Sequence, residues 1–331
     1  MKKMRKKIEP LISIIMSTKD TDESMLKMAI DSILLQVYKN FEFIIIVDGS
    51  KKDLNIIKQY SDNRIKIIIH EESIGLTKSL NEGLKIARGK YIARMDSDDV
   101  ALKKRLLYQV KFLEKRKEVD ICGTYIEYIG DRKGIQVDVF NKPKEKKAEL
   151  LIYNQIVHSS VMIRKEFLDK NNLQYNENFR YSQDYELWSR CSKITNIEVI
   201  SKVCMKYRVH KAQISTAKRN EQNKLCEHIF RRQLDELDIK DEKMIDIIFY
   251  LSKKSNNDYS YEELVKAIEE ILRKNKESNV YNNSTLQKVL YYRLFVMKYK
   301  EIGYKELLHV AIKCKIVNLA IRKIILNIKC L

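Results

Sequence analysis

The first hundred residues alternate between short apolar runs and stretches with helical periodicity. The apolar runs are rich in β-branched residues, which is typical of parallel strands buried on both faces. Between the first two runs, apolar positions from Met25 to Ile33 recur at the spacing of a helix that packs one face on a sheet. The pattern therefore predicts a βαβ unit within an open α/β sheet. We predict strands at Leu11–Met16, Phe43–Val47, Arg64–His70 and Tyr91–Met95.

A second amphipathic segment, from about Thr77 to Ala87, predicts a helix between the third and fourth strands. Gly89 follows it, and a glycine just beyond a helix typically forms the C-terminal cap. The fourth strand runs directly into the acidic segment Asp96–Asp99, and Asp48 ends the second strand. Because ligands bind beyond the carboxyl ends of strands in open α/β sheets, we expect these aspartates to share one binding edge.

The pattern changes after residue 100. From about Ala217 onward, helix follows helix, so we place a domain boundary near Thr216. This predicts an α/β domain over residues 1–216 and a helical C-terminal region over residues 217–331. Before the boundary we predict a helix at about Lys103–Arg116, strand-like pieces at Asp120–Tyr128 and Ser160–Ile163, and a helix that includes Asp184–Cys191.

Composition narrows the class of protein. The 331 residues include 44% hydrophobic and 33% charged residues, which is typical of a folded protein. The formal net charge of +19 indicates an anionic partner, such as nucleic acid, acidic lipid or a phosphorylated substrate. Six scattered cysteines without a CxxC pair favour reduced thiols. No apolar run approaches the ~20 residues of a membrane span, so we expect a cytoplasmic protein.

Asp96, Asp98 and Asp99 form a cluster that can do chemistry. Carboxylates packed this closely repel one another unless a cation or hydrogen-bond donors compensate. Oxygen-rich clusters suit Mg²⁺ or Mn²⁺, whose coordination is completed by waters and substrate phosphates. The alternatives are an Asp-rich turn, or a helix N-cap in which Asp98 or Asp99 caps the following helix. The cluster alone leaves both interpretations open.

An ordered set of motifs resembles the family 2 glycosyltransferases. Each motif is weak by itself, but their order over roughly residues 10–216 is specific. The resemblance implies the GT-A fold, a Rossmann-like mixed sheet that binds nucleotide-diphospho-sugars, followed here by the α-helical region. The motifs are SIIMST at 13–18, AIDSILLQ at 29–36, VDGS at 47–50, GLTKSLNEGL at 75–84, ARGKYIARMDSDD at 87–99, HSSVMIR at 158–164, QDYELW at 183–188 and YRVH at 207–210.

The resemblance implies an inverting transfer from a nucleotide-diphospho-sugar, with a UDP-sugar as the expected donor. Asp98 matches the metal-ligating aspartate of the family's DxD motif, so Mn²⁺ or Mg²⁺ is the expected cofactor. Asp96 is expected to contact the ribose or a metal-bound water, and is a further candidate ligand. His210 matches a position that often completes the metal site; the alternative is an ordinary loop histidine. The cation would neutralise the departing diphosphate.

Other residues are implied to bind the nucleotide-sugar. Asp48 matches the aspartate that accepts a hydrogen bond from the base, although this chain has one aspartate where the family often has two. A turn residue before Gly49 is the alternative for Asp48. Arg208 and Lys78 are candidates to hold the phosphates, or are plain solvated charges. The expected set is Thr18, Asp48, Lys78, Asn81, Arg94, Asp96 and Arg208.

Asp184 is the expected general base. An inverting transfer needs a carboxylate opposite the leaving group, to take the proton from the acceptor hydroxyl. The resemblance places Asp184 at the aspartate of the family's Glu-Asp pair, with Gln183 in place of the glutamate. The alternative is that Asp184 is a helix N-cap.

The expected acceptor is a saccharide or a lipid-linked saccharide, in the synthesis of a surface polysaccharide such as capsule, lipopolysaccharide or O-antigen.

The last third of the chain lies outside the resemblance. From Lys288 to Lys329, ten Lys or Arg stand against two Glu, a net of about +8. Helices with one basic and one apolar face suit the surface of an anionic bilayer, which would hold the enzyme on the inner face of the membrane. The alternative is a helical subdomain that packs on the catalytic domain or on a second subunit.

Two rival functions are weaker. A sugar nucleotidyltransferase usually has a Gly-rich basic loop after its first strand, but Ser17–Asp20 contains no glycine. A basic nucleic-acid-binding protein would account for the net charge of +19. However, no helix-turn-helix, zinc-finger or aromatic RNP-type motif accompanies that charge, so we expect no nucleic-acid partner.

Overall fold

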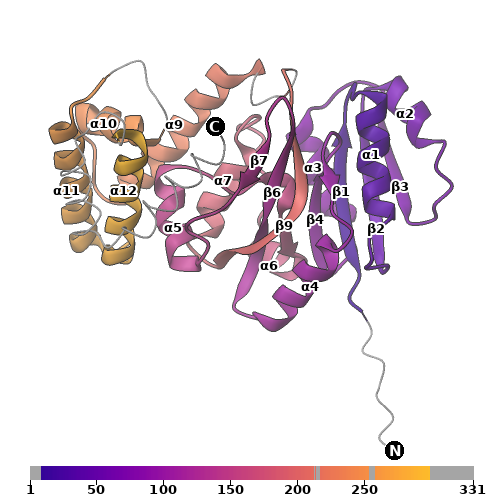
Figure 1. The fold of residues 1–331 in the computed structure, drawn as a ribbon, viewed down its shortest axis with the longest axis horizontal. Helices are drawn as coiled ribbons and strands as arrows, with labels where there is room; N and C mark the ends of the chain where they lie inside the picture. The colour runs from indigo at the N-terminus through magenta and orange to yellow at the C-terminus, as the bar shows by residue number, and fades with distance from the viewer. Residues whose placement is uncertain (1–8, 212, 214–216, 253–257, 299–331) are drawn as a thin grey trace, which may run out of the picture. The chain divides into compact units, whose positions relative to one another are not determined.

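The computed structural model describes residues 9–211, 213, 217–252 and 258–298, and they form two compact units (Figure 1). Unit 1 consists of Met1–Val137, Ile156–Leu187 and Glu198–Ala217. Unit 2 consists of Asp138–Gln155, Trp188–Ile197 and Lys218–Leu331. The basic segment 299–331, on which the membrane-surface prediction chiefly depends, lies outside the described residues.

The core of unit 1 is a nine-stranded mixed sheet, formed by the described residues, in the order β3-β2-β1-β4-β8-β6-β9-β5, with β7 paired to β6. β3, β2, β1 and β4 run parallel, whereas β8 pairs antiparallel with both β4 and β6. The strands are β1 Ile12–Thr18, β2 Phe41–Asp48, β3 Ile65–His70, β4 Tyr91–Asp96, β5 Val100–Ala101, β6 Val119–Gly130, β7 Gly134–Gln136, β8 Met162–Arg164 and β9 Asn196–Val209. This confirms the predicted mixed α/β sheet.

Helices cover both faces of the parallel strands. On one face, buried residues of α1 (Glu23–Leu34), α2 (Lys51–Ile57) and α4 (Arg105–Lys115) share a core with β1, β2 and β4. On the other face, α3 (Leu76–Ile86) packs so closely that a Cβ added at Gly83 would lie 2.5 Å from the side chain of Ile15. Double coverage explains why all eight residues of β2 are buried.

Gly89 has a different role from the predicted cap. The last turn of α3 is capped by Ala87, in an extended conformation. A Cβ added at Gly89 would lie 2.4 Å from the backbone nitrogen of Ser13, and the Gly89 N–H donates to Ser13 Oγ at 2.8 Å. The prediction of a C-cap was wrong. Glycine is required here because the residues that lead into β4 pass so close to β1 that a side chain does not fit.

The buried pair Arg105 and Gln109 of α4 holds together the strand ends that carry the acidic cluster. Arg105 Nη2 donates to the carbonyl of Arg94 at 2.7 Å and to that of Val161 at 3.3 Å. Gln109 Nε2 donates to the carbonyl of Ser160 at 2.8 Å. These bonds satisfy carbonyls just beyond the last β4–β8 pair, Ala93 with Met162. They fix the short helix η1 (His158–Ser160) beside β4.

Unit 2 contains the C-terminal helices, which pack around their own apolar core. The core includes Leu151, Phe230, Ile248, Ile268 and Leu290, each almost fully buried. Beside it, the fully buried Lys146 forms ion pairs with Asp138 and Glu149. The helices are α5 Pro143–Ile152, α9 Arg219–Asp235, α10 Glu242–Ser252, α11 Tyr261–Ser278 and α12 Asn283–Lys298. α9 to α12 confirm the predicted C-terminal helices over the described residues up to Lys298, whereas α5 lies before the predicted boundary near Thr216.

The length and hydrophobicity of the helices were compared with those of a membrane-spanning helix. Of the helices in the described part of the chain, none combines the length and the apolar character needed to cross a bilayer.

Candidate active site

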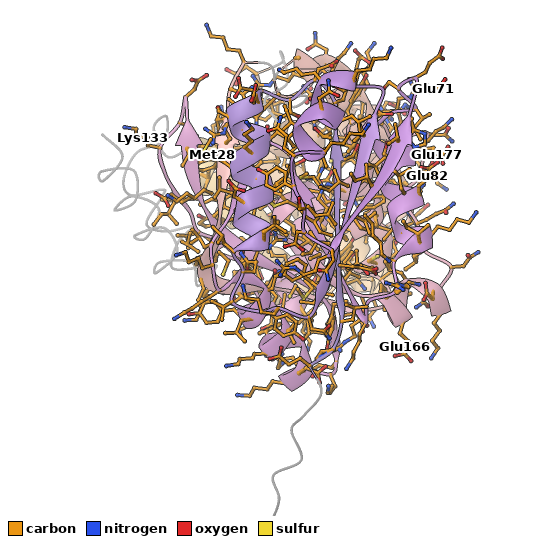
Figure 2. The ribbon with its side chains drawn as sticks, turned by 90° about the vertical axis from the view of Figure 1, so that its right-hand side faces the viewer. Met28, Glu71, Glu82, Lys133, Glu166 and Glu177 are labelled. Atoms are coloured by element: carbon orange, nitrogen blue, oxygen red, sulfur yellow. The ribbon has the colours of Figure 1, made fainter. Side chains whose placement is uncertain are left out.

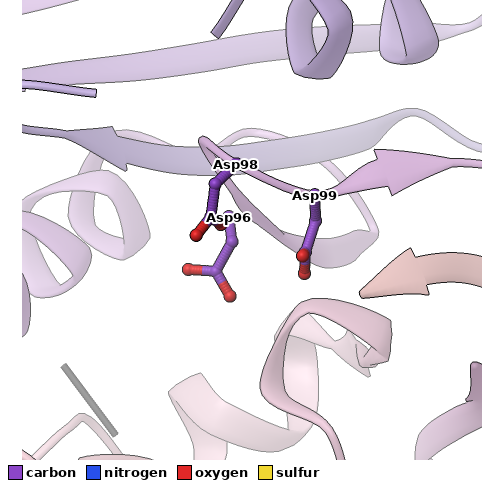
Figure 3. Close-up of side chains that lie close together, drawn as sticks. All are labelled: Asp96, Asp98 and Asp99. Atoms are coloured by element: carbon purple, nitrogen blue, oxygen red, sulfur yellow. The ribbon is translucent and has the colours of Figure 1, made fainter. Parts of the chain in front are cut away.

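The predicted acidic cluster forms at the carboxyl end of β4. Asp96 is the last residue of the strand, and Asp98 and Asp99 follow in the turn before β5. Figure 3 shows the three side chains extending from this turn toward the same side. One carboxylate oxygen of each lies within 4.8 Å of the others. The helix-cap alternative is wrong for Asp98 and Asp99, because β5 follows them and α4 is capped by Lys104.

His210, which follows β9 near the end of unit 1 in the sequence, lies next to this cluster. Its Nε2 lies 2.9 Å from Oδ2 of Asp98. The neighbouring strand β9 holds it there, since β5 pairs with β9 and the Nε of Arg208 donates to the Asp98 carbonyl at 2.8 Å. Two cis ligands of an octahedral ion, each at ~2.1 Å from the metal, lie about 3 Å apart. The Asp98–His210 spacing therefore fits a shared divalent cation.

Asp99 has a different environment. It is fully buried, and its carboxylate accepts from Ser159 Oγ at 2.5 Å and from the backbone N–H of Arg208 at 2.8 Å. Burial, together with the charges of Asp96 and Asp98, raises its pKa well above the usual range. Burial and the Asp96 charge also raise the pKa of Asp98. The three neighbouring carboxylates disfavour one another's ionised forms, and a bound cation would relieve this repulsion. The hydrogen bonds of Asp99 hold β9 beside the cluster.

Asp96 is paired with Arg94 on the same strand. Their side chains form an ion pair between Nη1 and Oδ1, and Arg94 is almost completely buried. Among the residues that the structure describes, none accepts a hydrogen bond from the Nε of Arg94. A buried guanidinium with an unused N–H beside three carboxylates is a candidate to bind an anionic ligand group.

Asp184 lies in the first turn of α7 (Gln183–Cys191), which begins in unit 1. Burial raises the pKa of its carboxyl; the charge of Arg94 acts in the opposite direction and that of Asp96 in the same direction. Asp184 is therefore within electrostatic range of Arg94 and Asp96, although 88 positions separate it from Asp96 in the sequence. A carboxylate whose proton affinity is raised is a better general base near neutral pH.

The predicted nucleotide-binding residues have several kinds of environment. The buried carboxylate of Asp48 accepts three hydrogen bonds from the loop before α3, from Ser73 Oγ at 2.8 Å, the Ile74 N–H at 2.6 Å and the Gly75 N–H at 3.0 Å. Lys78 is exposed in the first turn of α3. Both ends of the Asn81 amide bond to the backbone of Tyr175.

Thr18, at the end of β1, belongs to a small polar cluster that sequence reasoning missed. Its Oγ1 donates to Asp53 Oδ2 at 2.5 Å and lies 3.0 Å from the hydroxyl of Thr21. Thr21 in turn contacts Ser97 at 2.8 Å, which links β1 to the acidic turn. Asp53 follows the VDGS motif by three positions and is fully buried. An aspartate on the face of α2 that packs on the sheet was the sequence signal that could have predicted this cluster.

His158 and Ser159 were also missed as individual residues, although both lie in the motif HSSVMIR. Ser159 bonds Asp99, and His158 Nε2 lies 2.8 Å from the hydroxyl of Tyr175. Burial, with the charge of Arg94, lowers the pKa of His158 well below its usual value, which favours the neutral ring. The motif pointed to the right segment, but only the fold shows which partners its side chains bond.

Comparison with known proteins identifies the class. The model of the glycosyl transferase family 2 matches residues 13–171. A glycosyltransferase of Methanocaldococcus jannaschii is 38% identical over 210 residues, which covers 61% of this chain and 71% of that protein. One from Haemophilus influenzae is 32% identical over 238 residues, covering 68% and 73%. The chain belongs to the family 2 glycosyltransferases.

A relative with a specific name and two solved structures are also similar. The Escherichia coli UDP-Glc:alpha-D-GlcNAc-diphosphoundecaprenol beta-1,3-glucosyltransferase WfgD is 29% identical over 246 residues, covering 73% of this chain and 90% of that protein. TarS 1-349 of S. aureus, in complex with UDP-GlcNAc, has a TM-score of 0.57 at 17% identity and covers 88% and 91% of the two chains. The mannosyltransferase PcManGT of Pyrobaculum calidifontis, in complex with GDP-Man and Mn²⁺, has a TM-score of 0.52 at 13% identity, covering 93% and 81%. At these identities the structures establish the shared fold.

Proposed function

We propose that this glycosyltransferase moves a sugar, with inversion, from a UDP-sugar to a hydroxyl of a lipid-linked saccharide in surface polysaccharide synthesis. The observation that carries the proposal is the placement of Asp98 beside His210 at the carboxyl ends of the strands, with Asp184 within electrostatic range. The donor class is supported by TarS, crystallised with UDP-GlcNAc, and by the name of WfgD. The name of WfgD also supports the lipid-linked acceptor.

The donor set suits a hard or borderline divalent cation. Asp98 and His210 would hold Mn²⁺ or Mg²⁺, with Asp96 as a further ligand, since carboxylate oxygens and imidazole are among the groups these ions accept. When bound, the ion would offset the negative charge of the departing nucleoside diphosphate. Asp99 bonds Ser159 and the backbone of Arg208, and so holds η1 and β9 beside the acidic turn; it is not proposed as a metal ligand.

The remaining cationic and polar side chains are proposed to hold the donor. Arg94 presents its unused buried N–H to an anionic group of the donor. Arg208 and Lys78 would contact phosphates, and Thr18 lies at the same strand edge. Asp48, which organises the loop before α3, is proposed to face the base. Its carboxylate already accepts three hydrogen bonds and has room for about one more.

Asp184 is proposed as the general base. It would accept the proton of the acceptor hydroxyl while that oxygen forms the new bond to the anomeric carbon. The bond from this carbon to the diphosphate oxygen breaks at the same time, and the electron pair leaves with the nucleoside diphosphate. A base of this kind typically contributes about 10²–10⁴-fold to the rate.

The basic residues near the C-terminus are proposed to bind the anionic membrane surface at which the acceptor is held. An acceptor joined to an undecaprenyl-type lipid by a diphosphate is anionic and is held at a membrane surface. The basic segment from Lys288 to Lys329 carries a net charge of about +8, suited to such a surface on the inner face of the membrane. Removing residues 313–331 should release the protein from anionic liposomes. Unchanged liposome binding would refute this part of the proposal.

The proposed function is tested by a donor screen. UDP-, GDP- and dTDP-sugars are offered with Mn²⁺ and a lipid-diphosphate saccharide acceptor, and release of nucleoside diphosphate is measured. We expect release from a UDP-sugar that requires the acceptor, is abolished by EDTA and is lost in Asp98→Ala. If no donor is turned over, or if Asp98→Ala retains full activity, the proposal is wrong.

A further inference from the structure

The segment that leads to Asp184 has little regular structure of its own. α6 (Lys165–Lys170) ends before it and α7 begins after it at Gln183. Between them, residues 171–182 form turns in which most side chains are exposed or half-buried. The position of Asp184 in unit 1 therefore depends on contacts that fix this connecting segment, because a loop of this length has few conformational restraints of its own.

Asn81 supplies such a contact from α3. Its Nδ2 donates to the carbonyl of Tyr175 at 2.9 Å, and its Oδ1 accepts the Tyr175 N–H at 3.0 Å. One amide side chain thus bonds both polar groups of one backbone residue, as a neighbouring strand would. Figure 2 shows that Glu82, next to Asn81, and Glu177, two residues after Tyr175, lie on the same side of the molecule. Together, the bonds and this placement set α3 directly against the connecting segment.

The side chain of Tyr175 is fixed at its other end. Tyr175 is only 3% exposed, and its hydroxyl lies 2.8 Å from Nε2 of His158. The two rings meet edge to face, with centroids 5.4 Å apart. His158 belongs to η1, whose next residue, Ser159, bonds the carboxylate of Asp99. Tyr175 is thus joined through its backbone to α3 and through its ring to the acidic turn.

We propose that Asn81 is a positioning residue that, through Tyr175, sets the acceptor side of the active site by holding the segment that carries Asp184. The inference rests on the proposed function and refines it. The sequence resemblance implied that Asn81 binds the nucleotide-sugar. In the structure, both ends of its amide are engaged with Tyr175, so its loss should affect the acceptor step and spare nucleotide binding.

The test compares Asn81→Asp with Tyr175→Phe in the full-length protein. Asn81→Asp keeps the acceptor oxygen but places a carboxylate oxygen against the Tyr175 carbonyl and 3.5 Å from Glu177, so one bond becomes a repulsion. Tyr175→Phe keeps the ring and removes the hydroxyl, and with it the contact with His158. Asn178→Asp is the matched control, because Asn178 is an exposed asparagine of the same segment. Three quantities are measured: amide hydrogen exchange of residues 171–182, affinity for UDP with Mn²⁺, and steady-state constants for the acceptor.

We expect faster exchange in residues 171–182 for Asn81→Asp, a smaller increase for Tyr175→Phe, and none for the control. UDP affinity should be unchanged, while kcat falls or the acceptor KM rises, together by on the order of 10-fold or more. Unchanged exchange, or a loss of UDP affinity as large as the loss of transfer, would overturn the inference. Exchange and UDP binding need no turnover. A wild-type protein without transferase activity would therefore refute the proposed function, while the exchange of residues 171–182 still decides the role of Asn81.

Discussion

His210 and Asp98 stand 2.9 Å apart, although 112 positions separate them in the sequence. Their approach depends on β9, which pairs with β5 immediately after the acidic turn. Buried Asp99 strengthens this arrangement by accepting the N–H of Arg208, two residues before His210. The geometry of the proposed metal site is therefore set by strand pairing, and its side chains are held in place before any cation binds.

His210 should determine how tightly the cation is held. We expect His210→Gln to raise the Mn²⁺ concentration needed for half-maximal activity by about 10–100-fold, because one ligand is lost while Asp98 remains. Activity at saturating Mn²⁺ should be recovered in part. The control is His228→Gln, which changes an exposed histidine of α9 in unit 2. An unchanged Mn²⁺ requirement in His210→Gln would show that His210 is not a ligand.

Asp184 should govern catalysis without governing donor binding. Asp184→Asn is expected to lower kcat by about 10²–10⁴-fold, with little change in UDP affinity. Because burial raises the pKa of Asp184, the wild-type rate should fall on the acid side at a higher pH than an exposed aspartate would give. The residual rate of the Asn variant should lack that acid limb. Comparable rates for the variant and the wild type would rule out the proposed base.

Gly89 should be a stability position. In Gly89→Ala, the new methyl would lie 2.4 Å from the backbone nitrogen of Ser13, so the β1–β4 contact must shift. We expect the free energy of unfolding to fall by about 1–3 kcal/mol in urea titrations followed by circular dichroism. Gly123→Ala is the matched control, since its nearest neighbours would lie at an ordinary 3.5 Å. Equal stability of the two variants would contradict the packing described here.

Glu149 should make the stability of unit 2 depend on pH. Burial raises the pKa of Glu149 to about 7 from 4.5, although Lys146 opposes the shift. Because the folded-state value is the higher one, this contribution is complete below about pH 4.5 and is lost as the pH rises through about 7. Glu149→Gln should flatten the pH profile of unfolding over that window, whereas the exposed Glu262→Gln should not. A Glu149→Gln profile as steep as that of the wild type would contradict the assignment.

The central strands of the first hundred residues were predictable because they are largely apolar and buried on both faces. The predicted strands at Phe43–Val47 and Tyr91–Met95 lie within β2 and β4, and the segment before the acidic turn ends as expected. Periodicity worked here because burial on both faces leaves little ambiguity between strand and loop. The helix over about Lys103–Arg116 is confirmed as α4.

The second half of the sheet was harder to predict. β9, with 14 residues, was not predicted, because its burial is mixed and its sequence from Asn196 to Val209 includes charged positions. Its partners are β5 and β6, so its register is fixed by tertiary pairing rather than by a local signal. The segment 138–155 groups with the C-terminal helices through long-range packing, which local sequence does not reveal.

The candidate site shows the same division. The residue types at Asp96, Asp98, His210 and Asp184 were identified from motif order, and the structure brings Asp98 to His210. The contact between Asn81 and Tyr175 spans 94 positions and joins a side chain to a backbone, so no sequence motif records it. Ser159 and His158 were visible only as part of a motif. Their partners become clear once η1 is placed beside β4.

In the proposed site, Asp98 and His210 coordinate a divalent ion, and this ion binds the diphosphate of the donor. The most direct measurement is the anomalous difference map of a crystal soaked with Mn²⁺ and UDP. We predict one manganese peak within ~2.3 Å of Asp98 Oδ2 and His210 Nε2, in contact with both phosphates and absent in crystals of Asp98→Ala. A manganese peak elsewhere, or UDP bound with no metal between these two side chains, would contradict it.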